Sequence, residues 1–205
     1  MNIDGKQVVH LKNENPLKFE NVKVYAGDKY HEVADAEIRN FNVLQLEAKG
    51  IYWQLKCTEA LKVTILESNG IVELVCLTPK IVERENLLLD SLPVWGPEFE
   101  IHLEFKINSW IASYGSIFRF TATDEGCCDI GDRIPALWTQ MGTTDKLLLR
   151  TQINDHGNDG WIEELGTFVP SIWYSLKISQ RKDEVFFNAI FQNLKSISIF
   201  LEWWL

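Results

Sequence analysis

Residues 98–107, EFEIHLEFKI, alternate apolar and polar side chains without a break. Successive side chains of a β-strand point to opposite faces, so the apolar ones share a face. They are Phe99, Ile101, Leu103, Phe105 and Ile107. The other face carries only charged side chains and a histidine. We therefore predict a strand that is buried on one side and solvated on the other.

Similar short patterns recur about every ten residues along the chain, and no window shows helical periodicity over three turns. Further strands are predicted over residues 7–11, 17–25, 36–46, 50–55, 60–66, 71–77, 86–89, 116–123, 134–138, 146–153, 161–165, 172–180 and 185–191. PVWGP at 93–97 predicts a rigid corner, and 116–123 predicts a half-buried strand. Many short strands without helices indicate an all-β fold, an antiparallel β-sandwich.

Composition limits the classes of partner. The chain has 205 residues, of which 46% are hydrophobic, ample for a packed core. A net charge of −9 disfavours nucleic acid and anionic membranes as partners. No apolar run approaches the ~20 residues of a membrane span. The N-terminal segment lacks a signal-peptide pattern, so we expect either a cytosolic protein or a chain without its natural start.

The four cysteines leave the redox compartment open. Cys57, Cys76, Cys127 and Cys128 contain no CxxC pair, which disfavours a zinc site. Cys127 and Cys128 are neighbours, so they can form a vicinal disulfide, pair elsewhere, or remain thiols.

Several long segments carry a family resemblance. NLLLDSLPVWGPEFEIHLEFKINSW, IFRFTATDEGCCDIGDRIPALW, LLLRTQIN and WYSLKISQ, within residues 86–180, resemble the concanavalin A-like (laminin-G-like) jelly-roll domains of metazoan tandem-repeat type. Residues 1–43 resemble the final strands of the same domain. The resemblance implies a jelly roll, an extracellular or cell-surface location, and a glycan or an extracellular protein as the partner.

The order of these parts is reversed relative to the family. We expect residues 1–48 to be closing strands, 49–85 connecting strands or a linker, and 86–205 the main domain with an aberrant tail. The chain either straddles two tandem copies or completes its own sandwich. Because each half alone would leave an apolar face and a strand edge exposed, we expect 17–25 and 36–43 to pair with strands between 103 and 176.

Two polar loops are candidate ligand sites. Asp124, Asp129 and Asp132 share residues 124–133 with two glycines, and carboxylates are the ligands that Ca²⁺ prefers. The alternative is an ordinary turn, with Asp129 or Asp132 paired to Arg133. No cofactor is required on this interpretation, and Ca²⁺ is the candidate ion.

The second loop, residues 154–160, carries Asn154, Asp155, Asn158 and Asp159. It is either a solvated turn or, by resemblance to lectins, the place of glycan contact. Several tryptophans could stack on a sugar, although core packing is the usual role. The candidates are Trp95, Trp110, Trp138, Trp161 and Trp173. We expect Trp161 and Trp110 to be exposed.

The sequence also permits an enzyme. Glu100-x-His102-x-Glu104 is similar to the Glu-x-Asp-x-Glu strand of sandwich-fold glucanases, with His102 in place of the central Asp. Retaining hydrolysis needs two carboxyls ~5 Å apart, whereas residues two or four apart on a strand lie ~7 or ~13 Å apart at the backbone. The hypotheses are thus a non-catalytic binding or adhesion module, a glycoside hydrolase using Glu100 and Glu104, and a structural fragment.

Overall fold

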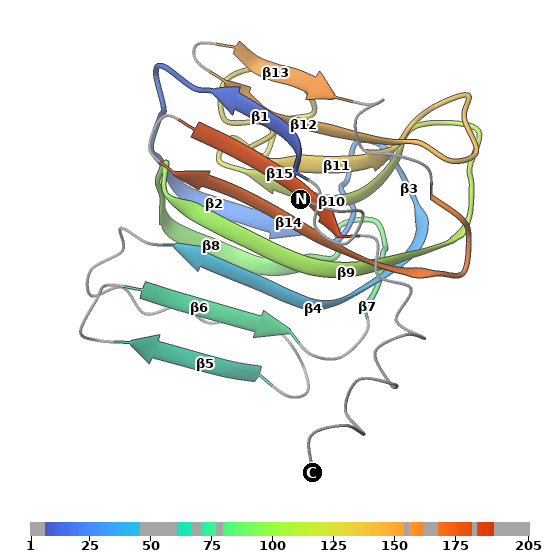
Figure 1. Ribbon diagram of the computed structural model, residues 1–205, viewed down its shortest axis with the longest axis horizontal. Helices are drawn as coiled ribbons and strands as arrows, with labels where there is room; N and C mark the ends of the chain where they lie inside the picture. The colour runs from blue at the N-terminus through green and yellow to red at the C-terminus, as the bar shows by residue number, and fades with distance from the viewer. Residues whose placement is uncertain are drawn as a thin grey trace.

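The computed structural model describes residues 7–45, 61–66, 71–76, 80–153, 156–161, 168–181 and 184–190. Within these residues the chain forms strands and no helix. Two sheets pack against each other, so the predicted all-β sandwich is confirmed (Figure 1). The segments 50–55 and 162–165, predicted as strands, lie outside the described residues, as does the tail from residue 191.

Sheet A contains, in spatial order, β1 (Gln7–Lys12), β15 (Glu184–Ile190), β14 (Trp173–Arg181), β9 (Phe99–Ser109), β4 (Asp35–Gln45), β6 (Ile71–Cys76) and β5 (Leu61–Leu66), with β7 (Lys80–Ile81) beside β4. Sheet B contains β13 (His156–Trp161), β12 (Leu147–Ile153), β11 (Ala136–Thr139), β10 (Gly115–Thr121), β2 (Phe19–Tyr25) and β8 (Leu87–Trp95). The short β3 (Glu32–Val33) pairs in parallel with β10, and the other pairs are antiparallel. No helix in the described part of the chain could cross a membrane.

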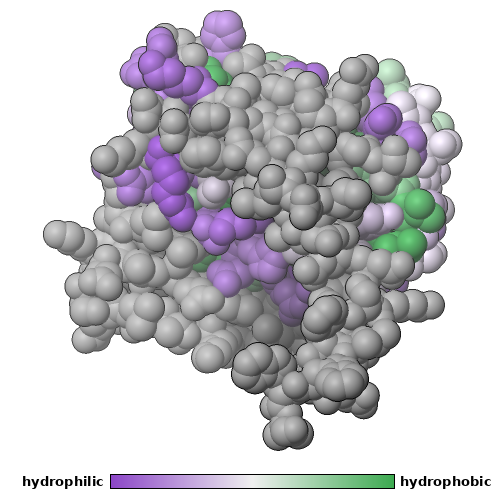
Figure 2. Space-filling view, viewed as in Figure 1, coloured by the Kyte–Doolittle hydropathy of each residue, from purple (hydrophilic) through white to green (hydrophobic). Residues whose placement is uncertain are grey.

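Strand β9 confirms the alternation predicted from the sequence. Its residues are buried and half-buried in strict turn from Phe99 to Asn108. The polar side chains lie on the outer face of sheet A, where the described residues near the centre are mainly hydrophilic (Figure 2).

Aromatic side chains from both sheets fill the space between them. Trp95 of β8 lies 4.9 Å from Phe120 of β10, measured between ring centroids. Phe41 of β4 contacts the same region of β10, with its ring centroid 6.1 Å from that of Phe120. One contiguous core therefore joins strands from both ends of the described chain.

The strands within residues 19–45 pair with strands after residue 86, as the sequence predicts. Strand β2 lies between β8 and β10, with Tyr25 opposite Arg119. Strand β4 runs along β9, with Ile38 opposite Phe105. The ladders join residues 19–45 and 87–121 in one sandwich.

The prediction of a short strand at 86–89 followed by a rigid corner at 93–97 is wrong. The structure forms a single strand, β8, that contains Pro93. Proline cannot donate to a ladder, but it is tolerated on an edge strand. Strand β8 is the edge of sheet B and pairs only with β2 among the described strands.

The predicted loop at 154–160 is also different in the structure. Residues from His156 onward form β13, which pairs with β12. The sequence HGNDGW lacks the β-branched residues typical of strands, so the ladder with β12 overrides local preference here.

Strand β10 is fully buried rather than half-buried. A bulge at Ile117 places both Ile117 and Phe118 in the core. The opposite face of the strand carries Arg119 and Thr121, and it is covered by the loop that follows.

A candidate binding pocket on the outer face of sheet B

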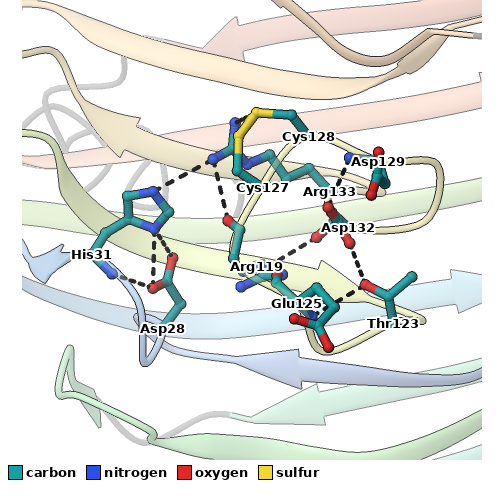
Figure 3. Close-up of a disulfide and its surroundings, with 11 residues drawn as sticks. Asp28, His31, Arg119, Thr123, Glu125, Cys127, Cys128, Asp129, Asp132 and Arg133 are labelled. Atoms are coloured by element: carbon teal, nitrogen blue, oxygen red, sulfur yellow. Dashed lines mark hydrogen bonds and ion pairs between the residues drawn. A yellow bond between two sulfur atoms is a disulfide. The ribbon is translucent and has the colours of Figure 1, made fainter.

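The loop 124–133 is held against β10 by a buried arginine (Figure 3). Arg119 is 1% exposed. Its Nε donates to the backbone carbonyl of Asp132 at 2.9 Å, and its Nη2 donates to the carbonyl of Glu125. A further contact of 3.4 Å reaches the Thr121 hydroxyl. These acceptors are all neutral, so they bind the guanidinium group without cancelling its charge.

Asp132 closes the loop on itself. Its carboxylate accepts a hydrogen bond from the Thr123 hydroxyl and another of 2.8 Å from the Asp129 backbone N–H. Asp132 is fully buried. The loop therefore has its own internal polar contacts, centred on the buried Asp132, while residues 127–130 are exposed.

Asp124 faces a different set of partners. Its carboxylate lies 3.0 Å from Lys23 Nζ and 3.2 Å from Lys29 Nζ, and it accepts a hydrogen bond from the Tyr25 hydroxyl. Burial would raise the pKa of this carboxyl, but the two lysines and Tyr25 outweigh burial and lower the pKa.

The three aspartates proposed as Ca²⁺ ligands do not converge. Asp124 bonds to β2 and to Lys29, whereas Asp132 bonds within the loop. No group of three acidic, histidine or cysteine side chains suitable for a metal occurs in the described part of the chain.

The adjacent cysteines form a vicinal disulfide at the tip of the loop. This is one of the arrangements that the sequence left open. Both residues are exposed. Arg133 Nη1 lies 3.9 Å from the Cys128 sulfur, so the disulfide contacts the arginine that follows it.

Arg133 also connects the loop to an aromatic group on sheet B. Its guanidinium carbon lies 4.7 Å from the centroid of the Trp138 ring, a cation–π geometry. The His31 ring meets the same tryptophan edge-on at 5.8 Å. Arg133 Nη2 and His31 Nε2 are 3.4 Å apart.

Asp28 fixes the orientation of His31. Its carboxylate lies 3.0 Å from His31 Nδ1 and accepts hydrogen bonds from the backbone N–H groups of Tyr30 and His31. Burial alone would raise the pKa of Asp28. The bonds from His31 and Tyr30 outweigh burial and lower the pKa to about 2, from an ordinary value of 3.8.

His31, Arg133 and Trp138 border a cavity of about 170 Å³. Its lining residues come from four parts of the chain, and they are His31, Tyr114, Arg133, Trp138, Leu148 and Arg150. Trp138 lies opposite Leu148 in the β11–β12 ladder, and Ala136 lies opposite both Arg119 and Arg150. Cross-strand partners share a face, so the two arginines flank a small side chain on the outer face of sheet B. We call this cavity the Trp138 pocket.

The Trp138 pocket is rich in positive charge. Burial lowers the pKa of Arg133, and repulsion from Arg119 and Arg150 lowers it further. Asp28 and Asp132 act in the opposite direction. The charged groups with the largest effects on the pKa of Arg133, among the described residues, are thus two further arginines and two aspartates.

The buried polar atoms on this face that lack a hydrogen-bond partner within the described residues include a donor of β11 and a hydroxyl of β10. One is the indole Nε1 of Trp138, which is 2% exposed, and the other is the hydroxyl of Ser116, which is fully buried. Ser116 lies opposite Trp138 in the β10–β11 ladder. Buried polar groups in proteins are usually bonded, so each requires a partner such as a water or a ligand.

Strand β13, which contains three of the ligand residues predicted from the second loop, approaches the first loop at Gly157. The backbone of Gly157 in β13 approaches that of Asp129 and Ile130 so closely that an added Cβ would lie 2.5 Å from the Asp129 carbonyl oxygen. Asn158, Asp159 and Trp161 belong to β13. Asn154 and Asp155 lie outside the described residues.

Trp110 follows β9 and is half-buried, with its ring packed against the core. Trp110 was predicted to be exposed, but the structure shows it only partly exposed. Its Nε1 is another buried donor without a partner among the described residues.

The two glutamates of the hydrolase hypothesis belong to ion pairs on the outer face of sheet A. Glu100 lies 2.7 Å from Lys177 Nζ and 2.9 Å from Arg181 Nη2. Glu104 lies 2.6 Å from Arg39 Nε. These cross-strand pairs occupy both carboxylates, and neither residue lines the Trp138 pocket.

The sequence interpretation did not assemble this pocket. Trp138 is a stacking candidate in the sequence, whereas Arg133 appears there only as a partner for aspartate and His31 is not among the candidates. One sequence signal could have indicated the pocket. Trp138 and Leu148 lie on apolar strands at positions that face away from the core, so large aromatic and apolar side chains are left on the outer face.

The fold and the site define an all-β sandwich with a cationic and aromatic pocket on one sheet. A search of protein families, of curated proteins and of solved structures finds no match to this chain.

Proposed function

We propose that this protein is a non-catalytic binding or adhesion module that recognises a glycan through the Trp138 pocket. The observation that carries this proposal is the composition of the pocket wall. An indole ring, a phenol and a leucine side chain lie beside two arginines and a histidine. Binding sites typically combine apolar and aromatic walls with a few polar groups that fix orientation.

The cavity volume supports a small ligand group. Binding pockets for drug-sized molecules occupy ~300–1,000 Å³, which exceeds the 170 Å³ found here. A cavity of ~150 Å³ accommodates benzene. The Trp138 pocket therefore suits a single six-membered ring, such as one terminal sugar of a longer glycan.

The family and the location belong to the same proposal. The two-sheet architecture is compatible with a concanavalin A-like jelly roll. The exposed disulfide supports an extracellular or cell-surface setting, because disulfides persist in oxidising compartments. Carbohydrate is favoured over a protein partner because the pocket is small and concave rather than broad.

A glycan array tests the proposal. The full chain is applied with and without Ca²⁺, beside Tyr114→Ala, which removes one wall of the pocket, and Met141→Ala, which alters an exposed side chain elsewhere. We expect a defined set of glycans to bind wild type and Met141→Ala, and to bind Tyr114→Ala more weakly. Absence of binding to any glycan, or equal binding by all three proteins, would contradict the proposal.

A further inference from the structure

We infer that the group bound in the Trp138 pocket carries a carboxylate on a six-membered ring. That the ring belongs to a glycan rests on the proposed function. That the ligand carries a carboxylate follows from the charges and hydrogen-bond donors of the pocket itself. The ligand class for a glycan would be an acidic monosaccharide unit at a chain end.

The first argument is charge. Arg133 and Arg150 line the cavity, and Arg119 shares a cross-strand row with Ala136 and Arg150. The guanidinium of Arg119 bonds only neutral acceptors among its hydrogen bonds described above. Burial lowers the pKa of Arg133, and repulsion from the other two arginines lowers it further, although Asp28 and Asp132 act in the opposite direction. An anion in the cavity would relieve this repulsion.

The second argument is the unpartnered donor. Trp138 lines the cavity, and its indole N–H is buried with no acceptor among the described residues. An indole N–H can only donate. A ligand oxygen that reaches this N–H would supply the missing acceptor, and a charged oxygen forms the stronger bond.

The third argument is shape. A carboxylate is planar and presents two oxygens, which match the paired donors of a guanidinium group. Tyr114, Leu148 and Trp138 supply apolar surface beside the arginines. The cavity thus has a polar part for a carboxylate and an apolar part for a ring.

The net charge of the whole chain favours a ligand with a single carboxylate over a polyanion. At −9, the protein repels extended nucleic acid and other highly charged polymers. A single carboxylate that enters a local cationic cavity meets much less of this long-range repulsion, because salt screens charges beyond ~10 Å.

Four small probes test the inference on the full chain by NMR of the indole N–H signals at physiological salt. They are methyl β-glucuronide, methyl β-glucoside, benzoate and benzyl alcohol. Each acid is paired with a neutral compound of similar ring and size. The Trp138 signal, one of eight tryptophans, is assigned with Trp138→Phe. We expect the two acids to shift it saturably and the neutral compounds to bind at least about tenfold more weakly.

Three variants test whether the preference for acids depends on a cation of the cavity. Arg150→Gln removes one cation from the cavity, and we expect about tenfold weaker binding of the acids. Arg150→Lys keeps the charge and should retain most of the affinity. Arg84→Gln removes the same charge from an exposed turn and should bind like wild type. Arg133 is left intact because it also contacts the disulfide.

The outcomes separate the inference from the proposed function. If glucuronide and glucoside bind equally well, the carboxylate inference is overturned and glycan binding stands. If benzoate binds in an Arg150-dependent way while both sugars fail, the carboxylate site stands and the glycan proposal fails. If no probe shifts the Trp138 signal, or if Arg84→Gln weakens the acids as much as Arg150→Gln does, the inference is overturned.

Discussion

The guanidinium Nε of Arg119 donates a 2.9 Å hydrogen bond to the backbone carbonyl of Asp132, thirteen residues later in the chain. Through this bond and the one to Glu125, a side chain on the outer face of β10 holds the entire loop that contains the disulfide. The loop in turn carries Arg133 to the Trp138 ring. The pocket therefore depends on a residue that does not line it.

Replacing Arg119 with methionine should destabilise the protein by about 2–4 kcal/mol. Methionine fills a similar space but leaves the carbonyls of Asp132 and Glu125 without their donor, and a buried unsatisfied group costs about 1–3 kcal/mol. Urea unfolding of Arg119→Met measures the loss, with Arg84→Met on the exposed turn as the control. A loss below about 0.5 kcal/mol would show that the loop does not depend on Arg119.

The pocket could not be assembled from the sequence because its parts meet only through the ladders. His31 and Arg150 are more than a hundred residues apart. The position of Trp138 depends on the β10–β11 register, which shifts at the bulge between Ser116 and Phe118. A shift of one residue exchanges the two faces of a strand, so alternation alone does not specify which residues of SIFRF face outward.

The core, by contrast, was largely predictable. In β9 the polarity of each side chain predicts whether it faces the core or the solvent, so ten residues are enough to predict the buried face of this strand. The pairing of residues 19–25 and 35–45 with later strands followed from their need for a partner sheet. The role of Asp124 did not follow, because Lys23 lies 101 residues away in the sequence.

Stability should fall at acidic pH in a manner that depends on Asp28. Its pKa of about 2 in the folded protein lies below the ordinary 3.8. The carboxylate therefore stabilises the fold above about pH 4, and this contribution is lost as the pH falls from 3.8 toward 2. The difference corresponds to about 2 kcal/mol.

Asp28→Asn tests this contribution by urea unfolding between pH 7 and pH 2. We expect the variant to be about 2 kcal/mol less stable than wild type at pH 7, with the difference disappearing near pH 2. Glu85→Gln removes an exposed carboxylate on a turn and serves as the control. A gap that is the same at every pH would mean that the bonds to His31 and Tyr30 are not the cause.

Truncating Phe105 should be among the most damaging core changes. Its ring lies 5.6 Å from that of Tyr174 and 5.5 Å from that of Phe168, and it is 1% exposed. Phe105→Ala should reduce the free energy of unfolding by about 3–5 kcal/mol. Ile81→Ala, at a 63% exposed position, should change it by less than about 0.5 kcal/mol. A loss below about 1 kcal/mol for Phe105→Ala would place this ring outside the core.

Calcium should have little effect on thermal stability. Asp124 already faces two lysines, and Asp132 is bonded within its loop. Melting temperatures in millimolar Ca²⁺ and in excess chelator should therefore agree within about 1 °C. A ligand that binds the folded state at a hundred times its dissociation constant stabilises by about 2.7 kcal/mol, so a rise of several degrees in Ca²⁺ would make Asp124, Asp129 and Asp132 ligands after all.

Loss of the disulfide should affect the pocket more than the fold. A bond between adjacent residues closes the smallest loop that a chain can form, and stabilisation through the unfolded state decreases as the closed loop becomes shorter. Replacing both Cys127 and Cys128 with serine should therefore lower the free energy of unfolding by only about 1 kcal/mol. The indole signal of Trp138 should nevertheless move, because Arg133 lies between the Cys128 sulfur and the Trp138 ring.

Chemical reduction of the wild-type disulfide should move the Trp138 signal in the same way. A large loss of stability with an unchanged Trp138 signal would reverse this assignment and make the disulfide a structural bond of the sandwich.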